Sequence, residues 1–84
     1  GEEQTALVEH SLRLASHEMR SWKATRFLIL QELMTGREVS ATAEKLSISP
    51  TAVYKNIDAG CLKTMASLFA SIETLLANEL GQNE

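Results

Sequence analysis

Apolar side chains recur along the chain at intervals of three and four residues, which is the spacing of amphipathic helices. Long stretches of this kind predict a helix over residues 3–19, a helix over residues 22–35 that Ser21 caps, and a helix over residues 62–80 that Gly81 stops. With two shorter helices between them, the pattern predicts an all-α fold of about five helices.

The two shorter helices are predicted within residues 39–57, around a tight turn after Leu46. Ser40 is the expected N-cap of the first and Ser49 that of the second, with Pro50 at the first helical position. The inward-facing positions are expected to be Ala43, Leu46, Ile48, Val53 and Ile57. Ala43 is small, as is needed where two helices cross closely.

This inward assignment leaves a polar outward face on the second short helix. Its members are Pro50, Thr51, Tyr54, Lys55 and Asp58. A helix that presents its N-terminal turn, a hydroxyl, a phenol and an ammonium group to solvent has the polarity of a helix that enters the DNA major groove.

Residues 43–57, AEKLSISPTAVYKNI, resemble the helix-turn-helix of bacterial transcription regulators, in particular the tetrahelical type of sigma-factor region 4 and LuxR-type domains. The pair Ala59-Gly60 and the long last helix also resemble the C-terminal domain of SatD-type proteins. The resemblance implies a cytoplasmic, sequence-specific DNA-binding domain. Many such motifs have glycine at the turn, where this chain has Ser47, so we expect either another turn type or local strain. No β-rich stretch with a glycine turn follows, so no wing is expected.

The length of the chain is enough for one modest core. It has 84 residues, of which 44% are hydrophobic, so we expect a single domain with little stability to spare. Within it, residues 1–19 form an N-terminal assembly helix, residues 21–60 the helix-turn-helix core, and residues 61–84 a C-terminal helix and tail. No apolar run approaches the roughly 20 residues that span a bilayer. The lone cysteine, Cys61, agrees with a reducing cytoplasm.

The net charge of −3 argues by itself against a nucleic-acid partner. Its distribution changes this conclusion, because residues 20–63 carry seven basic and four acidic side chains while both flanks are acidic. Phosphate contacts require only local positive charge. The candidate DNA contacts are Ser49, Pro50, Thr51, Tyr54 and Lys55 on the second short helix, and Arg26, Arg37 and Lys45 around it.

The two terminal helices carry apolar stripes that three short inner helices are not expected to cover. We therefore predict a homodimer, which would also present two recognition helices to two half-sites. The predicted interface residues are Val8, Leu12, Met19, Met65, Phe69, Ile72 and Leu76. The competing interpretation is that the first and last helices pack against each other within one chain.

No pattern of catalytic or metal-binding residues stands out. His10 and His17 are seven residues apart without a third ligand at a recognisable interval, and Cys61 has no basic neighbour in sequence. Gly-rich phosphate loops, nucleophile elbows and cysteine pairs are absent from the sequence. We expect no enzyme activity, cofactor, metal or small-molecule ligand. The alternative to DNA binding is a helical dimerisation or adaptor domain that binds protein partners.

Overall fold

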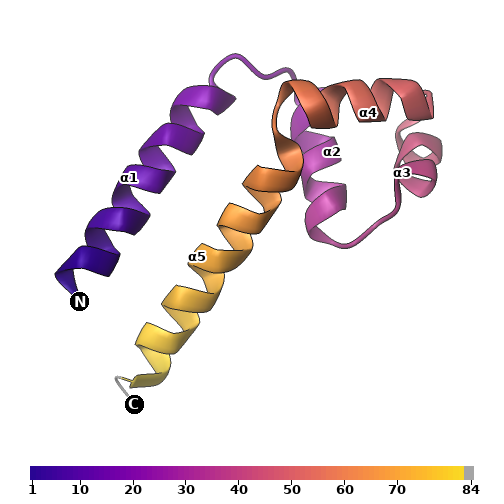
Figure 1. Cartoon of the computed structure of the whole chain (residues 1–84). Coiled ribbons are helices and arrows are strands. Elements are labelled where there is room, and N and C mark those ends of the chain that lie inside the picture. The colour runs from indigo at the N-terminus through magenta and orange to yellow at the C-terminus, as the bar shows by residue number, and fades with distance from the viewer. Residues whose placement is uncertain (83–84) are drawn as a thin grey trace.

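A computed structural model of the chain describes residues 1–82 and consists of helices throughout (Figure 1). They are α1 (Glu2–Met19), α2 (Ala24–Met34), α3 (Val39–Leu46), α4 (Pro50–Ala59) and α5 (Leu62–Gln82). No strand occurs among the described residues, so the predicted all-α class is confirmed. None of these helices is both long enough and apolar enough to cross a bilayer.

The molecule is elongated, with extents of 45 × 25 × 16 Å. Helices α2, α3 and α4 gather at one end, where α2 packs against α4 and α5, and α3 packs against α4. Helix α1 packs against α5 and runs antiparallel to it, so both termini lie at the other end (Figure 1). We refer to α1 together with the C-terminal half of α5 as the terminal arm.

The hydrophobic core lies where α2, α4 and the first half of α5 meet the end of α1. Its buried side chains are Ala15, Trp22, Ile29, Leu30, Ala43, Val53, Ile57, Leu62 and Met65. Ala43, Val53 and Ile57 are therefore inward as predicted, while Leu46 and Ile48 are half-buried against this cluster. Burial of these apolar side chains is the main favourable contribution to folding.

The predicted start of α2 is wrong by two residues. The helix begins at Ala24 with Lys23 as its N-cap, instead of at Trp22 behind a Ser21 cap. The hydroxyl of Ser21 donates to the carbonyl of Glu18 at 3.3 Å, so it completes the end of α1. Trp22 precedes α2 and is buried in the core, with its ring centroid 5.2 Å from that of Phe27.

Other helix ends also differ from the prediction, and α4 continues two residues past Ile57 to Ala59. Helix α3 begins at Val39 behind Glu38, so Ser40 lies inside the helix and is not its N-cap. Val39 is half-buried and packs against the core. This contact favours a helix that already includes Val39. Helix α5 continues through Gly81 to Gln82, because one glycine weakens a helix by only about 1 kcal/mol without necessarily ending it.

The turns between helices use left-handed backbone at three residues. Gly36 follows α2 with φ of 82°, as expected for a glycine that ends a helix. Ser47 ends α3 with φ of 57°, and Cys61 precedes α5 with φ of 51°. The sequence predicts either another turn type or local strain at Ser47, and its left-handed backbone shows that the chain accepts local strain there. Cys61, which follows Gly60, also has left-handed backbone. Gly60 serves close packing, since a Cβ there would lie 2.7 Å from Cδ of Arg26.

Candidate nucleic-acid interface

The N-terminus of α4 is fixed by its own cap. Ser49 has extended backbone, and its Oγ accepts a hydrogen bond from the amide of Ala52 at 3.1 Å, with Pro50 at the first helical position. This part of the prediction is confirmed. Because the Ser49 hydroxyl and the Ala52 amide are bonded to each other, the cap already uses two polar groups that could otherwise contact a phosphate at the start of the helix. The amide of Thr51 makes no hydrogen bond among the described residues.

The side chains of α4 divide sharply between its two faces. Val53 and Ile57 are 1% and 4% exposed and attach the helix to the core. The outward residues are all exposed, and they are Pro50, Thr51, Tyr54, Lys55 and Asp58, as predicted. The apolar side of α4 packs against α2, α3 and α5. This packing fixes the position of α4 and therefore the direction in which its polar face points.

Arg26 links α2 to α4. Its Nε donates to Oδ1 of Asn56 at 3.2 Å, and Nδ2 of Asn56 donates to the carbonyl of Ala52 at 2.9 Å. The guanidinium carbon lies 5.9 Å from the centroid of the Trp22 ring, within the range of a cation–π contact. Part of the Arg26 guanidinium is thus committed to packing. The sequence gives no signal for the role of Asn56, which depends on the crossing of two helices.

An open polar hollow lies beside α4 at the start of α2. It is lined by Ser21, Lys23, Thr25, Arg26 and Asn56. Lys23 is exposed there and enters no ion pair among the described residues. The hollow therefore adds positive charge and hydroxyl groups next to the exposed face of α4.

Glu32 is a buried carboxylate that sequence analysis did not single out. Its Oε1 accepts from Nζ of Lys45 at 2.7 Å, and its Oε2 accepts from Nε of Arg37. The hydrogen bond from Lys45, followed by that from Arg37, lowers the pKa of Glu32 in spite of its burial. One signal was present, because Glu32 is the single charged side chain in the apolar stretch of residues 27–34.

These contacts alter the roles expected of two cations. Arg37 and Lys45 were predicted to contact DNA, and both are paired with Glu32, which joins α2, the following loop and α3. Their side chains remain about half exposed, but part of their charge is neutralised. Among the described residues near α4, Lys23, Arg26 and Lys55 carry charge that no ion pair offsets.

The predicted dimer residues fall into two groups. Met65 and Ile72 are buried within one chain, and Val8, Met19 and Phe69 are half-buried. Leu12 and Leu76 are 40% and 53% exposed. Helices α1 and α5 pack against each other in the single chain, as the competing interpretation expects. Most of the two stripes is therefore used internally, and the terminal arm keeps a smaller exposed apolar surface.

The remaining candidate residues are not assembled into a site. His10, His17 and Cys61 are all exposed, and no cluster of three or more histidine, cysteine or acidic side chains within residues 1–82 is arranged to hold a metal ion. Comparison with known proteins finds no matching protein family, no matching curated protein and no matching solved structure.

Proposed function

We propose that this chain binds double-stranded DNA in a sequence-specific manner, with α4 in the major groove, as a domain of a bacterial transcription regulator. The observation that carries the proposal is the exposed polar face of α4, which stands on a helix whose other face is buried at Val53 and Ile57. A rigid helix with a capped N-terminus and polar outward side chains suits the width of the major groove.

Three side chains of this face have a chemical role in such a complex. The hydroxyl of Thr51 and its free amide lie at the positive end of the α4 dipole, where a phosphate or a base edge is favoured. Lys55 supplies a point charge without a carboxylate partner. Tyr54, which is 54% exposed, offers a ring edge to a thymine methyl group and a hydroxyl to a phosphate.

The hollow at the start of α2 supports phosphate binding beside α4. Lys23 and the outer nitrogens of Arg26 would meet the DNA backbone while α4 occupies the groove. Such contacts position a protein without reading sequence. The acidic total charge of −3 works against this attraction, so affinity would come from this local surface and would be sensitive to salt.

The proposal is tested by reversing one charge on the exposed face of α4. Lys55→Glu should weaken binding to a labelled DNA duplex by about tenfold or more, since it replaces an attraction to phosphate with a repulsion. Lys63→Glu is the matched control, because Lys63 is an exposed lysine beyond the C-terminal end of α4. Fluorescence anisotropy gives the affinity, and circular dichroism establishes equal helicity of the variants.

Equal affinities for Lys55→Glu and the unaltered chain would remove this face of α4 from DNA binding. The same conclusion would follow if Lys63→Glu lost as much affinity as Lys55→Glu, because a uniform loss reflects total charge alone.

The exposed apolar side of α2 favours a second candidate function, an adaptor domain that binds protein partners without DNA. Phe27, Leu28 and Met34 are 41%, 45% and 49% exposed on this helix. Exposed apolar patches often mark protein contacts. Two results together would favour this function. The chain would bind no DNA at low salt, and Leu28→Glu would abolish a complex that the unaltered chain forms with another protein.

A further inference from the structure

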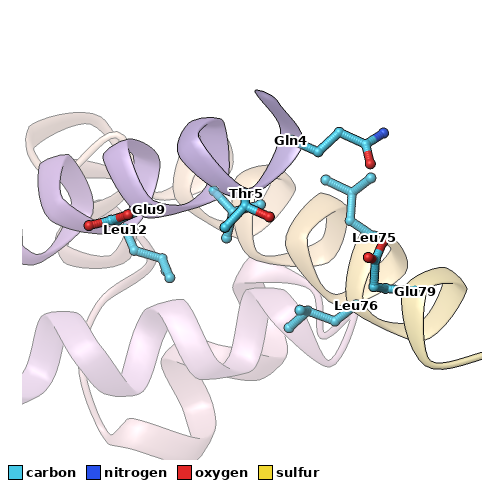
Figure 2. A pocket seen from close by; sticks show the side chains of 8 residues that line it. Gln4, Thr5, Glu9, Leu12, Leu75, Leu76 and Glu79 are labelled. Atoms are coloured by element: carbon cyan, nitrogen blue, oxygen red, sulfur yellow. The ribbon is translucent and has the colours of Figure 1, made fainter. Parts of the chain in front are cut away.

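The terminal arm carries an open apolar groove that the chain itself leaves uncovered. The groove lies between α1 and α5, where Thr5 and Leu12 on α1 and Leu75 and Leu76 on α5 surround one open space (Figure 2). It measures about 300 Å³, and Leu12 and Leu76 are 40% and 53% exposed at its edge. Two helices alone cannot enclose an apolar stripe of this width, whereas four helices can.

We infer that a second copy of this chain occupies the groove, so that two terminal arms pack in antiparallel orientation as a four-helix bundle. This inference does not depend on DNA binding. It refines the predicted homodimer by assigning the interface to one flank of the arm, around Leu12 and Leu76, instead of to the stripes that the single chain buries.

The charges along this flank favour a second copy and determine its orientation. Glu79 lines the groove toward the free end of the arm. An adjoining hollow continues from Leu12 toward the core as far as Arg20, and between these ends Glu9 and Arg13 form an ion pair with each other at 2.9 Å. Glu79 and Arg20 therefore carry opposite charges at the two ends of this flank, and neither takes part in an ion pair among the described residues. A two-fold axis near Leu12 places Glu79 of each copy beside Arg20 of the other.

The size of the flank is also sufficient for a dimer. Helix α1 has 18 residues, which corresponds to about 27 Å. Two helices side by side are about 18 Å wide, so the flat footprint is about 500 Å² on each copy. The total of about 1,000 Å² reaches the lower bound for specific protein interfaces. Figure 1 shows α1 and the C-terminal half of α5 away from α3 and α4, so pairing through the arm leaves the face of α4 accessible.

Sedimentation of the chain over a micromolar concentration range tests the inference. The unaltered chain should be a dimer at tens of micromolar, and Leu12→Glu combined with Leu76→Glu should be a monomer of equal helicity. Leu14→Glu is the matched control, because Leu14 is 73% exposed on the same helix but lies about 200° around it from Leu12. Leu28→Glu on α2 is a second control, and both controls should remain dimeric.

Glu79→Lys provides a variant that leaves the apolar side chains intact. It should raise the dimer dissociation constant several-fold, because it opposes Arg20 of the second copy with like charge. A monomeric unaltered chain across the whole range would overturn the inference and leave the groove to another occupant. The inference would also be overturned if Leu14→Glu or Leu28→Glu became monomeric while the combined Leu12→Glu and Leu76→Glu variant stayed dimeric.

The orientation is tested by a spin label on Thr5→Cys in a Cys61→Ser background. In the antiparallel dimer the two labels lie about 20 Å apart along the bundle, since residue 5 is seven residues from the axis near Leu12. Parallel packing would bring the labels within about 10 Å of each other. Labels at the shorter separation would contradict the antiparallel arrangement, and neither outcome bears on DNA binding.

Discussion

Individual polar side chains join the helices of this small domain at two points. Glu32 holds Lys45 and Arg37, and Asn56 holds Arg26. The carboxylate of Glu32 is buried. Removing Lys45 or Arg37 would therefore leave the negative charge of Glu32 with one partner fewer and without water to replace it. A domain with a core of this size has little stability to lose, which makes such contacts important to the fold.

Glu32 should make the stability of the domain depend on pH in the acidic range. Its pKa is lowered in the folded chain from an ordinary value of 4.5, first by Lys45 and then by Arg37. A group with a depressed pKa contributes stability that is fully present above the unfolded value and is lost as the pH falls through the folded value. Thermal unfolding from pH 7 to pH 3 should therefore show loss of stability below about pH 4.5.

Glu32→Gln should lower the melting temperature at pH 7 and flatten its dependence on pH below about 4.5. Glu38→Gln is the control, because Glu38 is exposed in the neighbouring loop and takes part in none of the ion pairs among the described residues. Equal pH profiles for Glu32→Gln and the unaltered chain would show that this carboxylate does not stabilise the fold.

The turn between α3 and α4 offers a second test at the residue scale. Ser47 has a φ of 57°, which costs a non-glycine residue free energy. Ser47→Gly should raise the free energy of unfolding by about 0.5–1 kcal/mol, after allowing for the greater entropy of glycine in the unfolded chain. Ser40→Gly, inside α3, should lower it by a similar amount. Urea denaturation measures both, and destabilisation by Ser47→Gly would argue against the left-handed turn.

At the scale of the elements, the sequence predicts the existence of all the helices because their apolar spacing is regular. The ends of the helices are less predictable, as Ser21 and Ser40 show. Both have the chemistry of N-caps, yet Ser21 bonds back to Glu18 and Ser40 lies inside α3. Ser49 is predicted correctly, since Pro50 beside it restricts the backbone to a helix start.

The candidate interface was predictable to a similar degree. The exposed face of α4 follows from helical periodicity, so Thr51, Tyr54 and Lys55 lie outward as expected. The pairing of Arg37 and Lys45 with Glu32 was not predictable, because Lys45 is 13 residues away along the chain. Only the folded arrangement shows that part of the expected positive charge is neutralised.

At the scale of the whole molecule, the chain divides into two parts with different surfaces. Helices α2, α3 and α4 form one end of the molecule (Figure 1). This end presents the polar face of α4 and the hollow lined by Lys23 and Arg26. The terminal arm presents an apolar groove with separated charges. If both proposals hold, these parts would have separate roles, in which the arm would pair two copies and each α4 would read one half-site of a DNA duplex.

The salt dependence of binding to duplex DNA tests the central proposal most directly. With about four phosphate contacts for each copy, the logarithm of the binding constant should fall linearly with the logarithm of salt concentration, with a slope of about −4 for one bound copy and about −7 for a bound dimer. Anisotropy titrations of a labelled mixed-sequence duplex between low and physiological salt give this slope. Measurable affinity at low salt that declines in this way would support DNA binding through the surface around α4. Absence of binding at low salt, or a binding constant that salt does not change, would contradict it.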